Sequence, residues 1–214
     1  MIDLEESSIS NRAIFSVIFN IIRAGIGFST AMLLAKWLGP EGYGRLAFLI
    51  ASLLAVRGLI DMSTSQAFFT FLSQRPRSKT FVNFFLLWIL FQLAMSVIVT
   101  ALILPDSYID LIWQGEARSL VVLALIAVFM QHQVWQVALS MAEASRHTVR
   151  VQSLTLVVTF SHLLIIVGLW VWGQLLLPFI FWALIFEWTV ASFVAANMYA
   201  TSSENTSKDT IQSV

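Results

Sequence analysis

The sequence predicts an all-α, polytopic membrane protein, a bundle of six transmembrane helices. Hydrophobic residues make up 58% of the 214 residues and charged residues only 11%, whereas a soluble domain has about 25% charged residues. The mean hydropathy of +0.84 agrees with this prediction. The apolar residues form six long stretches, each close to the roughly 20 residues that cross a bilayer. So few charges could not cover the surface of a soluble protein of this size.

The first two stretches are joined by a turn rich in glycine. The first stretch covers about residues 13–38, and the second covers about residues 46–71 and ends at a basic loop. Glycine and proline interrupt helices, so we expect the chain to reverse sharply between them. The residues of this turn are Gly39, Pro40, Glu41, Gly42, Tyr43 and Gly44.

The other four stretches cover about residues 81–104, 120–141, 151–172 and 175–199. Pro105 ends the third stretch, and Gly173 separates the fifth from the sixth. The chain therefore divides into a polar cytoplasmic segment at 1–12, a six-helix bundle at 13–200 and a tail at 201–214. The tail is rich in serine and threonine, and we expect it to be disordered and cytoplasmic.

The composition argues against several classes of function. The chain has no cysteine, which excludes disulfides and thiolate metal sites. Its net charge is zero, so nothing attracts it to nucleic acid. The sequence shows no phosphate-binding loop, no nucleophile with a base and no metal-ligand spacing. We expect neither an enzyme nor a cofactor.

The distribution of lysine and arginine predicts the orientation in the membrane, because cytoplasmic loops carry the excess of these residues. With the N-terminus inside, the inner segments carry seven and the outer segments three. Both termini are therefore expected in the cytoplasm. The inner residues are Arg12, Arg75, Arg77, Lys79, Arg146, Arg150 and Lys208; the outer ones are Lys36, Arg45 and Arg118.

Two arginines lie within the apolar stretches, where a charge that faced lipid would cost at least about 2.5 kcal/mol. Arg23 precedes the end of the first stretch by about fifteen residues, and Arg57 follows the glycine-rich turn by about thirteen. At about 1.5 Å per residue, each lies about 20 Å from the turn. We expect both side chains near the bilayer centre, facing a polar interior.

Further polar residues recur at helical spacing and predict one polar stripe on most helices. Such stripes would together enclose a wet cavity. The stripe of the first helix is Ser16, Asn20, Arg23, Gly27 and Thr30; that of the second is Arg57, Asp61 and Thr64; that of the fourth is His132, Gln136 and Glu143; that of the fifth is Gln152, Thr155, Thr159 and His162; the sixth helix carries Glu187.

Structural interpretations of the same residues stay open beside the functional one. Polar side chains in membrane helices often only hold helices together. Arg57 and Asp61, four residues apart, fit a structural ion pair. His132 and His162 fit interior hydrogen bonds, and Glu187 fits a contact with a neighbouring helix. Arg23 has no carboxylate one turn away on its own helix, so the functional interpretation is strongest there.

The turn at 36–44 (Lys-Trp-Leu-Gly-Pro-Glu-Gly-Tyr-Gly), with residues 59–65 (Leu-Ile-Asp-Met-Ser-Thr-Ser) after the next helix, resembles a known signature. It is similar to the amino-terminal motif of the Wzx-type oligosaccharide and polysaccharide flippases of the multidrug/oligosaccharidyl-lipid/polysaccharide exporter superfamily. Ser63 stands where that family prefers glycine. The motif covers about 30 residues, and the topology extends the likeness over six helices.

The resemblance implies a protein of the bacterial inner membrane. It would transport a polyprenyl-diphosphate-linked oligosaccharide across that membrane during synthesis of a cell-surface polysaccharide, such as the O-antigen of lipopolysaccharide. Arginine suits a diphosphate because its planar fork matches phosphate oxygens. The expected substrate cavity contains Arg23, Arg57, Asp61, Asn20, His132, Gln136 and Glu187.

Length is the main departure from that family. Its members have twelve to fourteen helices in two lobes, so this chain would supply one lobe. Three interpretations are open: a truncated flippase, a half-length flippase that acts with a second copy, and one that acts with a separately encoded second half. Two alternatives remain: a small-molecule exporter of the same superfamily, and a non-transporting remnant or scaffold subunit of a polysaccharide assembly complex.

Overall fold

A computed structural model describes the backbone of residues 2–74, 79–144 and 148–212, and the side chains of residues 14–74, 80–142 and 149–196. All regular secondary structure in this part of the chain is helical, which confirms the predicted all-α class. The elements are α1 (Ile2–Asp61), α2 (Thr64–Gln74), α3 (Lys79–Ile98), η1 (Val99–Ile103), α4 (Asp106–Trp113), α5 (Arg118–Phe129), η2 (Met130–Val134), α6 (Trp135–Ala144), α7 (Thr148–Val171) and α8 (Leu177–Gln212).

Within the described residues, five helical segments are long and apolar enough to cross a membrane. They support the prediction of a protein embedded in a membrane. The first of them has 48 residues, far more than the roughly 20 that one crossing needs. The segments are Ile14–Asp61, Thr80–Ile103, Arg118–Ala142, Val149–Val171 and Leu177–Ala196.

Helix α1 bends at Gly39, which has φ 71° and ψ 175°. This backbone region is essentially restricted to glycine. Pro40 follows and opens the next helical run, a position where its fixed φ fits and no hydrogen bond is lost. We call residues 2–38 the first arm and residues 40–61 the second arm. The turn is thus shorter than the predicted one over 39–44, because residues 40–44 are helical.

The second predicted stretch, 46–71, is not one continuous helix. The second arm ends at Asp61, and α2 begins at Thr64. Met62 and Ser63 between them have φ 44° and 63°, left-handed values that L-residues seldom adopt. Helix α8 continues to Gln212, through residues that the sequence indicated as a disordered tail.

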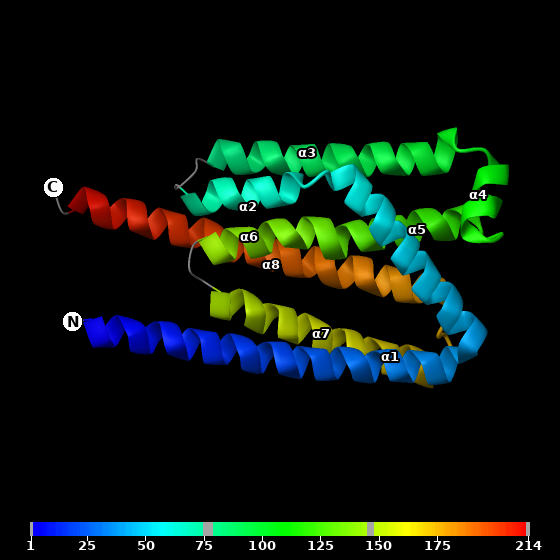
Figure 1. The fold of residues 1–214 in the computed structure, drawn as a ribbon, viewed down its shortest axis with the longest axis horizontal. Coiled ribbons are helices and arrows are strands. Elements are labelled where there is room, and N and C mark those ends of the chain that lie inside the picture. Colours follow the sequence, from blue (N-terminus) through cyan, green and yellow to red (C-terminus); the bar gives the residue numbers. More distant parts are fainter. Residues whose placement is uncertain (1, 75–78, 145–147, 213–214) are drawn as a thin grey trace.

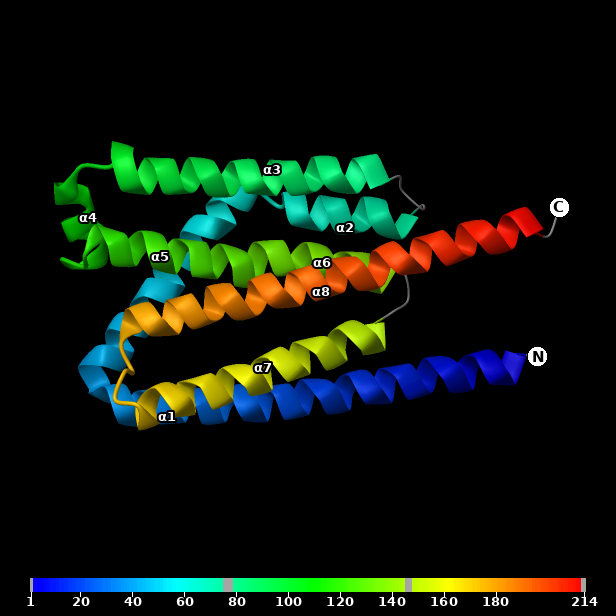
Figure 2. The ribbon, with the colours of Figure 1, turned by 180° about the vertical axis from the view of Figure 1, so that it is seen from behind.

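The long helices lie side by side, and the chain passes between two ends of the bundle (Figure 1). Both termini lie at one end, where α2 also ends and α3 and α7 begin. The bend of α1, α4 and the link from α7 to α8 lie at the other end. From that end the second arm crosses the bundle, away from the first arm and towards α2 and α3, a course that Figure 2 shows from behind.

The interior is formed around α5, α6 and α8. In the segment Arg118–Ala142, 56% of an apolar 18-residue stretch is buried inside the bundle. The corresponding stretch of Ile14–Asp61 is only 11% buried. The largest fully buried side chains include Phe129 and Phe181. Large apolar side chains cover the outer faces, such as Phe28 at 68% and Leu102 at 79% exposure. An apolar exterior is what a lipid environment requires.

Candidate functional site

Side chains next to the break between α1 and α2 form hydrogen bonds across it. Oδ1 of Asp61 accepts hydrogen bonds from the hydroxyls of Thr64 at 3.0 Å and Ser65 at 2.7 Å, and from the Ser65 backbone N–H at 3.2 Å. Gln92 of α3 donates to the carbonyl oxygen of Ile60 at 3.1 Å. Backbone groups freed within a membrane need such partners, because lipid offers none.

Gln133 of η2 joins this break to the centre of the bundle. Its side-chain amide nitrogen donates to Oδ1 of Asp61 at 2.7 Å and to the Ser65 hydroxyl at 2.9 Å, and its oxygen accepts from Nε of Arg57 at 2.5 Å. Arg57 also lies 3.9 Å from Oδ2 of Asp61. Gln133 is completely buried. We call Arg57, Asp61, Ser65 and Gln133 the polar network.

Consecutive polar residues of η2, a π-helical segment, face two different sides. Gln133 enters the polar network, while Gln131 and His132 line a cavity on the other side. Single-turn π-segments within α-helices often lie at functional sites. Gln136, one turn further along in α6, is half-buried.

This cavity has a volume of about 560 Å³ and lies between both arms of α1, η2, α7 and α8. Its wall is largely apolar and includes Leu34, Leu54, Ile180, Leu184 and Trp188. Polar side chains contribute part of the wall: Thr30, Tyr43, Gln131, His132, Thr159 and His162. Four of these, Thr30, His132, Thr159 and His162, belong to the polar stripes that the sequence predicted.

Glu187 of α8 pairs with His162 of α7 beside this cavity. The distance from Nδ1 of His162 to Oε2 of Glu187 is 2.7 Å, and the side chains are 18% and 5% exposed, respectively. The contact with a neighbouring helix, left open from the sequence, is therefore the arrangement found for Glu187. The rest of the fifth-helix stripe is structural: Gln152 donates to Ser16 at 2.8 Å, and the hydroxyls of Thr155 and Thr159 bond within α7.

Arg23 lies in different surroundings from Arg57. Its Nη2 donates to Oδ1 of Asn20 at 2.9 Å, and both residues are exposed on the first arm. Their neighbours Ile21 and Ile22 are also exposed, at 65% and 44%. The structure therefore does not bring the two arginines together around one cavity. Arg23 and Asn20 form a polar patch on an otherwise apolar outer face.

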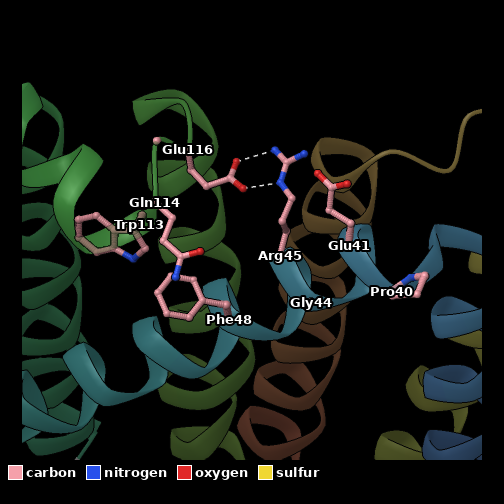
Figure 3. A pocket seen from close by; sticks show the side chains of 9 residues that line it. Pro40, Glu41, Gly44, Arg45, Phe48, Trp113, Gln114 and Glu116 are labelled. Carbon is pink, nitrogen blue, oxygen red and sulfur yellow. Dashed lines mark hydrogen bonds and ion pairs between the residues drawn. The ribbon is translucent and has the colours of Figure 1, made fainter.

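A second pocket, of about 550 Å³, lies at the bend of α1 (Figure 3). Arg45 of the second arm and Glu116 of the α4–α5 loop form a two-pronged ion pair across it, at 2.5 Å and 2.8 Å. Pro40, Glu41 and Gly44 of the predicted turn motif line this pocket. The pair fastens the bend to the neighbouring loop.

Sequence reasoning missed three residues that the structure makes important. Gln133 lies outside the predicted stripe of the fourth helix, although it is completely buried. An amide such as Gln92 inside the most apolar stretch signals a buried partner. Glu116 bonds to Arg45, which is 71 residues distant, and spacing along the sequence does not reveal such a pair.

Comparisons with known proteins returned no match, neither to a family model, nor to a curated protein, nor to a solved structure. Among the described residues, no three histidine, aspartate or glutamate side chains gather closely enough to hold a metal ion. The function of the protein is therefore inferred from the geometry of the chain and from the residues of its turn motif.

Proposed function

We propose that this chain is a membrane transport subunit that supplies one lobe of a carrier for polyprenyl-diphosphate-linked oligosaccharides. The exposed pair of Asn20 and Arg23 is the observation that carries the proposal. An arginine facing lipid at mid-span costs at least about 2.5 kcal/mol. A second lobe and an anionic ligand would together remove that cost, because they would enclose the guanidinium and pair it with phosphate oxygens.

The proposal assigns the phosphate to Arg23 alone. Arg57 already bonds to Gln133 and lies near Asp61, so its charge is offset within the chain. The resemblance of residues 36–44 to the flippase turn supports the class of substrate. The two arms of α1 would then count as two crossings, giving six in all, with both termini in the cytoplasm. The second lobe would be a second copy of this chain or a separately encoded half.

A second candidate is a non-transporting subunit of a polysaccharide assembly complex. The closed polar network and the largely apolar cavity favour it, because neither offers a continuous polar path within this chain. In that case the patch of Asn20 and Arg23 would bind another membrane subunit instead of a ligand.

Complementation of a flippase-deficient bacterial strain would test the proposal. The chain would be expressed alone and together with a candidate second half, and surface polysaccharide would be measured. Restored polysaccharide that depends on Arg23 supports transport. A chain that restores no polysaccharide with any partner, yet co-purifies with assembly proteins, supports the second candidate instead.

The proposed orientation can be tested by labelling single cysteines in intact cells with an impermeant thiol reagent. A cysteine at position 42, next to the bend, should react, and one at position 77 should not. Position 77 lies outside the described residues, in the part of the sequence between the end of α2 and the start of α3. The reverse pattern of labelling would rule out the orientation.

A further inference from the structure

His162 and Glu187 form an isolated acid–base pair inside the bundle. Their side chains meet at 2.7 Å, and the carboxylate is the more buried of the two, at 5% against 18% exposure. Oε1 of Glu187 is buried and has no hydrogen-bond partner among the described residues. His162 lines the cavity of about 560 Å³, whereas Glu187 lies behind it. The imidazole therefore separates the carboxylate from the cavity.

The described side chains that line the cavity beside this pair include no permanently positive group. The elements packed around the cavity contribute two other titratable side chains, His132 from η2 and Tyr43 from the second arm of α1. Thr30, Gln131 and Thr159 are polar but uncharged. Among the described residues that line the cavity, none is lysine or arginine. Glu187 thus has one partner that can neutralise it, and that partner is neutral or positive according to whether it carries a proton.

We propose that His162 and Glu187 together form a binding site for one proton, which is loaded from the cavity through His162. This inference does not depend on the transport proposal. With the proton bound, the pair has no net charge, whether as imidazolium and carboxylate or as imidazole and carboxylic acid. Without it, the pair carries one negative charge inside an apolar bundle. That state leaves an uncompensated charge in low dielectric, which is costly.

The geometry defines the path of this proton. A proton from the cavity bonds to Nε2 of His162, and the hydrogen on Nδ1 moves along the 2.7 Å contact to Oε2 of Glu187. Release follows the reverse order and restores the starting tautomer. The net charge of the pair between α7 and α8 therefore differs by one unit between the loaded and the empty state. Chains of acidic residues and histidine serve this purpose in proton-handling membrane proteins.

Infrared difference spectroscopy over a pH titration, on the full chain reconstituted in lipid vesicles, tests the site directly. The wild-type protein should show a titrating carboxyl band, and Glu187→Gln should remove it. Glu116→Gln is the matched control, because it removes the buried carboxylate that pairs with Arg45, and the Glu187 band should persist in it. His132→Gln should also leave the band in place. A band of unchanged amplitude in Glu187→Gln would overturn the proposal.

A second measurement avoids the risk that Glu187→Gln does not fold. Nitrogen NMR of wild-type protein labelled at histidine reports the protonation of both ring nitrogens, and His162→Gln assigns the signal. The proposal expects the His162 signals to change together with the carboxyl band. In His162→Gln the amide can still donate to Glu187 but cannot carry the proton, so the band should titrate at a different pH. His162 signals that stay constant wherever the protein remains folded would refute the site.

Discussion

The two arms of α1 each carry an arginine within an apolar helix, and the two have opposite surroundings. Arg57, on the second arm, donates to the fully buried Gln133 and lies near Asp61. Arg23, on the first arm, is exposed and bonds to Asn20, three residues away on the same helix. Arg57 is part of an ion pair, and among the described residues no ion pair includes Arg23.

The difference separates a structural role from a candidate functional one. A charged group whose partners lie within the chain holds helices together, and its removal should affect folding first. A charged group without such partners contributes little to the fold. Within a membrane-spanning helix it needs an interaction partner from another molecule. Both residues are arginines on the same kinked helix, so the same substitution at Arg23 and at Arg57 can be compared directly. Four predictions follow this comparison, from the largest expected effect on stability to the smallest.

Arg57→Ala should destabilise the protein by about 3 kcal/mol, the lower end of the range for breaking a buried ion pair. The substitution leaves Asp61 charged inside the bundle and removes the donor to Gln133. The effect stays at the lower end because Asp61 keeps its bonds to Thr64 and Ser65. Unfolding of detergent-solubilised protein, followed by circular dichroism, would measure it. A variant as stable as the wild type would mean that the polar network does not hold the break.

Gly39→Ala should cost about 1–3 kcal/mol, because alanine is strained at φ 71° and ψ 175°. A Cβ at this position would meet nothing within 4 Å, so the cost is conformational. Gly44→Ala is the control: it has equally free space and lies within the helical second arm, where alanine is favoured. The same unfolding assay should separate them. Equal stability of the two variants would contradict the observed position of the bend.

Gln133→Leu should destabilise by about 1–2 kcal/mol, in keeping with hydrogen bonds measured between membrane helices. It removes the link from η2 to Arg57, Asp61 and Ser65. Gln136→Leu, on the next turn, should have a much smaller effect, because that side chain is only half-buried. If Gln136→Leu proved the more harmful, the orientation of η2 and α6 would be wrong.

The sequence predicted the helical class and the position of the bend because both depend on local composition. Apolar stretches bounded by glycine and proline form membrane helices wherever they occur. It did not predict that Arg23 and Arg57 would separate. Equal distance from the turn was expected to bring them together, but the angle at Gly39 sends the second arm away from the first (Figure 1).

The candidate site was predicted less well. The expected stripe of His132, Gln136 and Glu143 assumed 3.6 residues per turn, and the side chain of Glu143 lies outside the described residues. In the π-helical segment η2, His132 faces the cavity while Gln133 faces Asp61. The contact between His162 and Glu187 joins two helices, and the spacing of residues along either helix does not reveal that pairing.

Arg23→Ala is expected to have the smallest effect on stability, below about 0.5 kcal/mol, as for surface substitutions away from packed features. Among the described residues its side chain bonds to Asn20, and it lies exposed on the first arm. Its effect on function should be the largest of all, if the transport proposal holds. Arg23→Ala should then abolish complementation while the protein still inserts and unfolds normally.

Arg23→Lys refines that expectation. An ammonium keeps the charge but loses the planar fork that binds two phosphate oxygens, so it should restore activity only in part. Asn20→Ala serves as the second control, because it frees the guanidinium without removing it and should reduce activity less than Arg23→Ala. Full activity of an Arg23→Ala, Arg57→Ala double variant would end the phosphate-binding hypothesis. The exposed arginine would then be a contact for another membrane subunit, as the second candidate function requires.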